Sequence, residues 1–234
     1  MQAETVLTAL LVGLAASSAL VIGAVAGVFF EPPQRLVAVA LAFASGALIT
    51  ALAFDLFEEA FKAGGPWVAG SGLLAGATAF VAADGLLSRY GGSSGFALLA
   101  GVTLDGVPEN LALGVGLIGS SLTGILALLV GIFASNLPEA LGGAVDMRNG
   151  GRSRGFVVAT WTATAVLLTV AVVAGNILLA GADEAVLAFA RAFASGAVLA
   201  SVADTVMPDA YREGGPLVAL ATAAGFLLTF LISQ

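Results

Sequence analysis

The sequence contains no cysteine and no histidine among its 234 residues. Without cysteine it can form neither disulfides nor thiolate metal sites, and without histidine it lacks HExxH zinc-protease motifs and Ser-His-Asp triads. Charged residues are also scarce, at 10% of the chain, whereas a typical soluble domain has about 25%. Hydrophobic residues make up 59% of the chain, and the mean hydropathy is +1.07. These values place most of the chain in a lipid bilayer.

Eight apolar stretches of about 20 residues, the length that crosses roughly 30 Å of hydrocarbon, follow one another along the sequence. Clusters of glycine, proline and polar residues separate them, as expected for connections between helices. The first stretch is longer than the apolar part of a signal peptide and follows an acid rather than bases, which indicates a permanent span. The predicted spans are 5–30, 36–57, 66–88, 95–118, 122–146, 155–181, 185–207 and 215–233. The sequence therefore predicts an all-α, polytopic membrane helix bundle that forms one domain over residues 1–234.

The basic residues predict the orientation of this bundle. With eight spans and an external N-terminus, only Lys62 and Arg191 fall in outside loops. The remaining six fall inside: Arg35, Arg89, Arg148, Arg152, Arg154 and Arg212. An excess of basic residues in the cytoplasmic loops is the usual arrangement in membrane proteins. We therefore expect a multi-pass protein of the cell membrane with both termini external.

An internal repeat supports the same layout. The segment Ala42-Phe-Ala-Ser-Gly-Ala47 recurs as Ala192-Phe-Ala-Ser-Gly-Ala197, and the match continues without gaps to the two Gly-Gly-Pro turns that end at Pro66 and Pro216. The predicted second and seventh spans cross the membrane in opposite directions. Inverted repeats of this kind are typical of secondary transporters, whose sites lie near the membrane midplane. We expect spans 1–3 and 6–8 to be related in this way around spans 4 and 5.

Two Pro-Glu motifs lie in the middle of the fourth and fifth predicted spans. They read Asp105-Gly-Val-Pro-Glu109 and Ser135-Asn-Leu-Pro-Glu139. A carboxylate at membrane depth costs several kcal/mol and is retained mainly where it binds something. A proline removes one backbone N–H donor and frees the carbonyl four residues earlier, so we expect both helices to open locally.

The spacing within the two motifs predicts a shared polar site. Asp105 and Glu109 are four residues apart and therefore lie on one helix face, and Asn136 and Glu139 share a face in the same way. Because both motifs are about equally far from the turn near residue 122, they lie at one depth of an antiparallel helix pair. Oxygen ligands of this kind suit hard or borderline divalent cations. The predicted metal ligands are Asp105, Glu109, Asn136 and Glu139, with Ser135 as a fifth candidate.

Alternatives remain for several polar residues. Asn136 and Ser135 are equally compatible with simple hydrogen bonds between packed helices. Asp55 and Asp204 lie late in their spans, near opposite membrane faces, and are candidates for an entrance and an exit or for solvated helix ends. Asp84 is expected at the membrane interface. The two glutamates are harder to explain structurally, because neither span contains a basic residue that would neutralise them.

The whole chain resembles the ZIP (Zrt/Irt-like) metal transporters, and most closely a histidine-poor prokaryotic branch of that family. The fourth helix of the family reads roughly His-Asn-x-Pro-Glu-Gly. Here Asp105 and Gly106 replace the histidine and the asparagine, while Pro108 and Glu109 match. The fifth helix of the family carries a polar pair followed by x-Pro-Glu, which this sequence matches with its second motif.

The resemblance implies eight spans with external termini, a divalent metal cation as the transported substrate and transport into the cytoplasm. The loss of the family's histidines leaves Zn²⁺, Mn²⁺ and Fe²⁺ open as substrates. The sixth predicted span has no carboxylate and Gly106 supplies no ligand, so the resemblance implies one oxygen-rich site rather than a two-metal centre. It also implies a possible homodimer in the lipid bilayer. We expect no other cofactor and no nucleic-acid partner.

Two other classes of protein were weighed against the transporter. An intramembrane aspartyl protease needs two facing aspartates and a Gly-x-Gly-Asp pattern, which is absent from the sequence. A non-transporting ZIP-like membrane protein with a degenerate metal site fits the missing histidines. The sequence favours the transporter and predicts no enzymatic activity.

Overall fold

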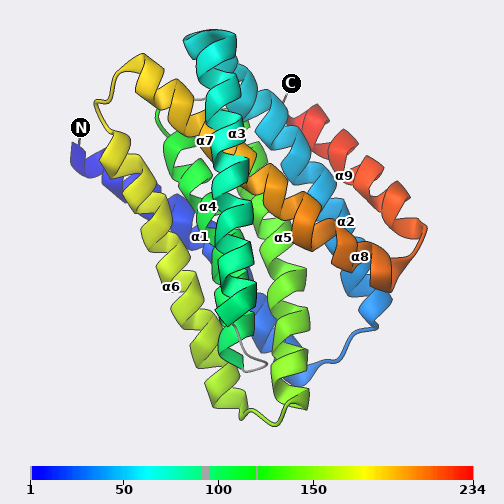
Figure 1. The fold of residues 1–234 in the computed structure, drawn as a ribbon. Helices are drawn as coiled ribbons and strands as arrows, with labels where there is room; N and C mark the ends of the chain where they lie inside the picture. Colours follow the sequence, from blue (N-terminus) through cyan, green and yellow to red (C-terminus); the bar gives the residue numbers. More distant parts are fainter. Residues whose placement is uncertain (1, 91–94, 120, 234) are drawn as a thin grey trace.

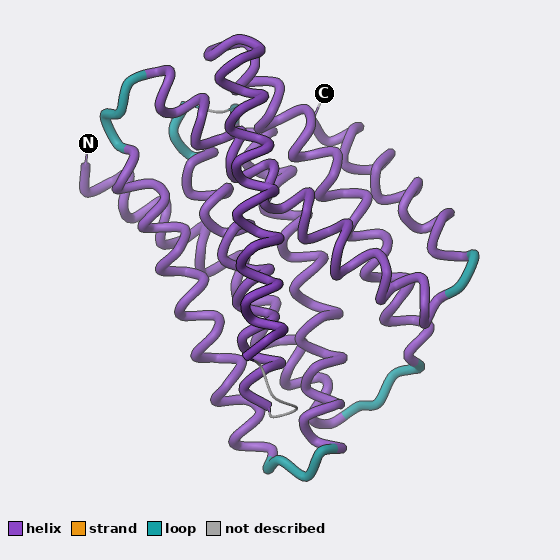
Figure 2. The backbone as a smooth tube through the Cα atoms, viewed as in Figure 1, coloured by secondary structure: helices purple, strands orange, loops and turns teal. Residues whose placement is uncertain are grey.

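The computed structural model describes residues 2–90, 95–119 and 121–233. Every regular element in these residues is helical (Figures 1 and 2). In chain order the elements are α1 (Gln2–Phe29), α2 (Gln34–Thr50), the π-helical segment η1 (Ala51–Phe57), α3 (Glu58–Tyr90), α4 (Gly95–Gly116), α5 (Leu122–Asn149), α6 (Arg154–Leu179), α7 (Glu184–Ser201), the π-helical segment η2 (Val202–Val206), α8 (Met207–Gly214) and α9 (Leu217–Ser233). The all-helical fold class is therefore confirmed.

The predicted count of eight membrane spans is not confirmed. Five helices in the described residues are long and apolar enough to cross a bilayer. They are Glu4–Phe29, Gln34–Leu87, Leu122–Asn149, Arg154–Leu179 and Glu184–Gly214. The predicted spans 36–57 and 66–88 run together in one of these helices, and the last predicted span gives an apolar helix of 17 residues. The region 95–118 is helical over most of its length but is not among the five.

The helix that contains the two predicted spans is interrupted at Gly65. This residue has φ 70° and ψ −179°, outside the helical region, and Pro66 follows it directly. A positive φ is accessible to glycine because it has no Cβ atom. In Figure 1 the chain rises through α2 in blue and descends through α3 in teal. The turn therefore falls at the Gly-Gly-Pro break that the sequence indicated.

The two repeated stretches share local features as well as sequence. The π-helical segments η1 and η2 occupy overlapping positions when the second stretch is shifted back by 150 residues. Gly215, which lies 150 residues after Gly65, also has a positive φ, of 64°. In Figure 1 α2 rises while α7 descends, and the two ends of the chain both lie in the upper part of the view.

The repeated stretches also pack against each other in a reciprocal manner. α2 lies against α9, and α7 lies against α3. A Cβ atom on Gly46 of α2 would clash with the carbonyl oxygen of Thr222 in α9, and one on Gly196 of α7 would clash with that of Leu73 in α3. Gly196 lies 150 residues after Gly46. Small residues at both contacts therefore let each repeat approach the other closely, as helix packing in membranes requires.

α1 supports the helix that carries the second Pro-Glu motif. Its glycines Gly23 and Gly27 face the α5 backbone, where added Cβ atoms would clash with the carbonyl oxygens of Leu137 and Leu141. Leu137 directly precedes Pro138 of the motif. The close contact with α1 thus fixes the position of α5 at the motif.

Candidate functional site

Both Pro-Glu motifs lie in continuous α-helix. Pro108 is inside α4 and Pro138 is inside α5. The predicted local opening of these helices is therefore not observed; the widened helical turns occur at η1 and η2 instead. Each proline still lacks the N–H group that would bond to the carbonyl four residues earlier, at Leu104 and Ala134, because that donor is absent from the covalent structure of proline.

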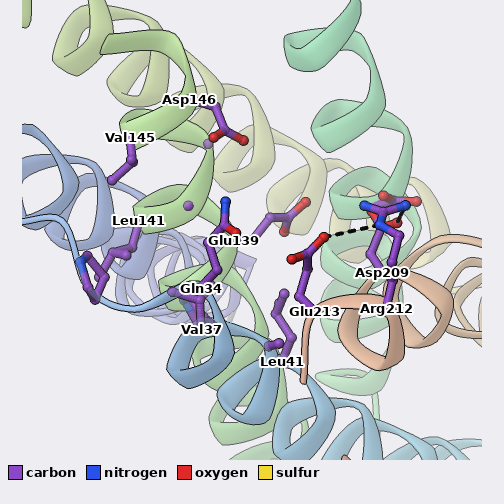
Figure 3. Close-up of a pocket in the computed structure, with 16 residues that line it drawn as sticks. Gln34, Val37, Leu41, Glu139, Leu141, Val145, Asp146, Asp209, Arg212 and Glu213 are labelled. Carbon is purple, nitrogen blue, oxygen red and sulfur yellow. Dashed lines mark hydrogen bonds and ion pairs between the residues drawn. The ribbon is translucent and has the colours of Figure 1, made fainter. Parts of the chain in front are cut away.

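A cavity of about 510 Å³ reaches the first residue of one motif and the last residue of the other. Asp105 of α4 and Glu139 of α5 both line it. Figure 3 shows Glu139 and Asp146 on α5, with Glu213 and the bonded Asp209 and Arg212 of α8 beside them. The cavity walls come from the α1–α2 connection, α2, α4, α5 and α8. It extends along α5 as far as Asp146, close to the end of that helix.

Asp105 is oriented by two hydroxyl groups from the second repeat. Ser201 Oγ donates a hydrogen bond to Asp105 Oδ1 at 2.9 Å, and Thr205 Oγ1 lies 3.3 Å from the same oxygen. Ser201 is the last residue of α7, and Thr205 belongs to η2. The carboxylate is thus held by neutral hydroxyl donors beside the cavity.

Glu109 and Ser135 connect the two motifs directly. Glu109 is buried, with 4% of its surface exposed. Ser135 Oγ lies 3.4 Å from Glu109 Oε2 and 3.0 Å from the carbonyl oxygen of Ile132. Because a hydroxyl carries a single proton, the shorter bond to Ile132 competes with the longer one to Glu109. The glutamate is therefore only weakly satisfied by this neighbour.

Asn136 is buried, and both of its side-chain polar atoms, Oδ1 and Nδ2, are without a hydrogen-bond partner in the described chain. Buried polar atoms are paired in the great majority of proteins, so an unpaired amide beside a carboxylate motif requires an explanation. A ligand that binds between α4 and α5 would supply one. The observation favours the ligand interpretation of Asn136 over the packing interpretation.

Glu139 is partly buried, and the negative charges of both Asp105 and Glu109 act on it. The structure therefore brings the three predicted carboxylates into one electrostatic neighbourhood. They do not form a ready metal site, because no group of three or more acidic side chains in the described residues has the arrangement needed to hold an ion. Side-chain rearrangement would be required before the three could share one cation.

The opposite end of α5 is closed by polar contacts. Asp55 of η1 is buried, and Ser233 Oγ donates to its Oδ2 at 2.8 Å. The buried guanidinium of Arg191 forms an ion pair with Glu59 at 3.4 Å and donates to the carbonyl oxygen of Ile118. Asp55 does not line the cavity, and neither does the exposed Asp204. The predicted entrance and exit residues are thus not part of the cavity lining.

Sequence reasoning missed the hydroxyls that hold Asp105 and the arginine at the closed end. Ser201 and Thr205 are four residues apart, which is the same spacing as Asp105 and Glu109. That spacing was an available signal. Arg191 was counted only as an external charge, although its side chain is largely buried.

The five long apolar helices of the described residues indicate a multi-pass membrane protein. No protein-family model matches the chain. The chain is 30% identical over 226 residues to an Arabidopsis thaliana protein named "Putative zinc transporter At3g08650". The alignment covers 91% of this chain and 36% of the plant protein, so the chain spans about a third of the relative's length. A plant relative gives no support to the prokaryotic branch inferred from the sequence.

Proposed function

We propose that the protein is a ZIP-like membrane transporter that carries divalent metal cations, Zn²⁺, Mn²⁺ or Fe²⁺, into the cytoplasm. The observation that carries this proposal is the cavity that joins Asp105 of one Pro-Glu motif to Glu139 of the other. Ionisable residues at membrane depth typically mark an ion pathway. The similar plant protein is named as a zinc transporter, and this name also supports transport of a metal.

The proposed ligands are three carboxylates and one amide, with a hydroxyl as a fifth candidate. They are Asp105, Glu109, Asn136, Glu139 and Ser135. The unpaired Oδ1 atom of Asn136 and the mutual repulsion of the acids are both relieved when a cation binds among them. An all-oxygen set suits Mn²⁺ and Fe²⁺, whereas Zn²⁺ sites more often include nitrogen or sulfur ligands. The metal is the transported substrate.

The proposed direction follows from the charges near the open end. Arg148 and Arg212 lie at the cavity end of α5 and α8, respectively, and Arg35 begins α2 beside it. Basic residues accumulate on the cytoplasmic side of membrane proteins. The cavity then opens to the cytoplasm, the contacts around Arg191 close the external side, and both termini are external. Eight crossings in the cell membrane and a homodimer remain part of the proposal through the resemblance.

A second candidate function is a non-transporting ZIP-like protein with a degenerate metal site. The absence of a ready three-acid group in the described residues favours it. An intramembrane aspartyl protease is disfavoured, because the sequence lacks the Gly-x-Gly-Asp pattern.

The deciding experiment is metal uptake into proteoliposomes with Mn²⁺, Fe²⁺ and Zn²⁺ tested separately. We expect saturable uptake of at least one ion, and a loss of at least about 100-fold in the Glu109→Gln/Glu139→Gln variant, since removing metal-site groups costs this much or more. Asp183→Asn/Glu184→Gln, which changes two exposed acids outside the cavity, is the matched control. Metal-dependent thermal stabilisation without uptake would select the non-transporting alternative.

A further inference from the structure

The hydroxyl groups of Ser201 and Thr205, from α7 and η2 of the second repeat, contact the carboxylate of Asp105 on the central helix α4. Ser201 is fully buried, and its hydroxyl lies 2.9 Å from Asp105 Oδ1. Thr205 lies 3.3 Å from the same oxygen. We propose that these two residues are positioning residues of the metal site, which hold Asp105 in place and thereby set the affinity and selectivity for the cation. This inference rests on the proposed transport function.

Neutral donors have a particular consequence for a carboxylate at membrane depth. A charge taken out of water must be hydrogen-bonded or paired. At the closed end this is done by an ion pair between Glu59 and Arg191. At Asp105 it is done by hydroxyls, which stabilise the carboxylate without cancelling its charge. Asp105 therefore remains available to attract a cation from the cavity that it lines.

The two hydroxyls differ in how strongly they hold the carboxylate of Asp105. Thr205 Oγ1 lies 2.7 Å from the carbonyl oxygen of Ser201, closer than it lies to Asp105. A hydroxyl has one proton to donate, so Thr205 divides its hydrogen bond between two acceptors. Ser201 is therefore the stronger support of Asp105. The geometry therefore predicts a larger effect on the metal site from loss of the Ser201 hydroxyl than from loss of the Thr205 hydroxyl.

Holding one carboxylate oxygen also affects which cations fit. With Oδ1 engaged by Ser201 and Thr205, Asp105 presents itself to a cation through one oxygen. Larger cations such as Ca²⁺ accept carboxylates that bind through both oxygens, in flexible sites with six to eight ligands. Loss of the hydroxyls should therefore relax selection against Ca²⁺ while it weakens binding of the smaller transition-metal ions.

The test is uptake by the full chain in proteoliposomes, with Mn²⁺ as the probe and Ca²⁺ as competitor. We expect Ser201→Ala to raise KM about tenfold and Thr205→Val about threefold, because bonds to charged groups are the stronger ones. Ser201→Thr should restore the KM. Ser195→Ala is the matched control, since Ser195 is a buried serine of the same helix whose hydroxyl bonds to the backbone of Arg191. If the Ser201→Ala variant does not fold, Thr205→Val tests the same positioning role independently.

A double-mutant cycle separates positioning from a general structural effect. In an Asp105→Asn background, Ser201→Ala should change KM by less than about twofold, because coupled residues are non-additive. If Asp105→Asn impairs uptake but Ser201→Ala behaves like Ser195→Ala, or Ca²⁺ competition is unchanged, the positioning role is wrong and transport stands. If the Asp105→Asn variant takes up Mn²⁺ as well as the unmodified protein does, Asp105 is not a metal ligand and the proposed metal site is wrong.

Discussion

The segments η1 and η2 occupy matching positions in the two repeats, yet their polar side chains have different partners. In η1, Asp55 bonds to Ser233 at the closed end of the molecule. In η2, Thr205, which lies 150 residues after Asp55, contacts Asp105 beside the cavity. π-Helical turns are frequent at functional sites. The segment η2 therefore contacts a central acid, Asp105, whereas a polar side chain of η1 bonds to the C-terminal helix instead.

The central helices carry a correspondence of their own. Pro108 and Pro138 are 30 residues apart, and the same shift relates Asp105 to Ser135. If the two repeats exchange roles, the contact between Thr205 and Asp105 becomes a contact between Asp55 and Ser135. Rocking of repeats around a fixed site is the general mechanism of inverted-repeat transporters. We therefore expect Asp55 to approach the metal site when the external side opens.

Cross-linking provides the sharpest test of this exchange, because the expected outcome is nearly all or none. The chain has no native cysteine, so pairs can be introduced directly. Asp105→Cys/Thr205→Cys should cross-link with a short bifunctional thiol reagent in the state described here. Asp55→Cys/Ser135→Cys should not, until the closed end is loosened by Arg191→Gln. Mass spectrometry of proteolytic fragments measures both yields. Cross-linking of the second pair alone would reverse the assignment of the open side.

The sequence predicted candidate site residues from patterns that are encoded along one helix. Acids four residues apart, prolines beside glutamates and a 150-residue repeat are local patterns, and the structure brings Asp105, Glu109 and Glu139 into one electrostatic neighbourhood. The repeat also placed the Gly65 turn correctly. These features follow from helix periodicity and backbone chemistry alone.

Contacts between helices distant in the sequence were beyond such reasoning. Ser201 lies 96 residues from Asp105, and a serine in an apolar helix commonly bonds to its own backbone instead, as Ser195 does. The expected opening at Pro108 and Pro138 was wrong, since α4 and α5 stay helical through both residues. Neighbouring helices are able to stabilise such prolines in membranes, and no local pattern reveals where they pack.

The closed end should depend on Arg191 more strongly than on any other basic residue. Arg191→Gln removes the ion pair with Glu59 and most of the donation to Ile118. Breaking a buried ion pair costs about 3–5 kcal/mol, so for this partly exposed pair we expect about 2 kcal/mol of lost stability. Thermal unfolding of the purified protein measures the loss, with the exposed Arg212→Gln as control. Equal melting temperatures for the two variants would contradict a closing role for Arg191.

Replacing Asp105 by histidine should change the selectivity of the proposed metal site between Zn²⁺ and Mn²⁺. Imidazole suits Zn²⁺ better than Mn²⁺, and the change also removes the acceptor that Ser201 and Thr205 hold. We expect preference for Zn²⁺ over Mn²⁺ to rise about tenfold, since imidazole is a common zinc ligand. Competitive uptake of the two ions measures it. Asp105→Asn, which keeps the shape of the side chain without supplying imidazole, should weaken Mn²⁺ uptake without gaining Zn²⁺ preference; an equal gain there would place the metal elsewhere.

The smallest expected effect concerns the exposed acid at the mouth of the cavity. Asp146 lines the cavity near the end of α5, and its charge and that of Glu213 repel each other. Its carboxylate should steer cations electrostatically, because acids outnumber the one arginine, Arg212, in the lining of the cavity. Asp146→Asn should therefore slow uptake about twofold at low ionic strength and have little effect at about 0.15 M salt, where the Debye length is about 8 Å.

Asp183→Asn, at the N-terminus of α7 and outside the cavity, is the matched control in uptake assays from the cavity side. A salt-independent loss would mean that Asp146 binds the metal directly, and an equal salt-sensitive loss in both variants would mean that net charge alone, rather than the cavity, attracts the ion.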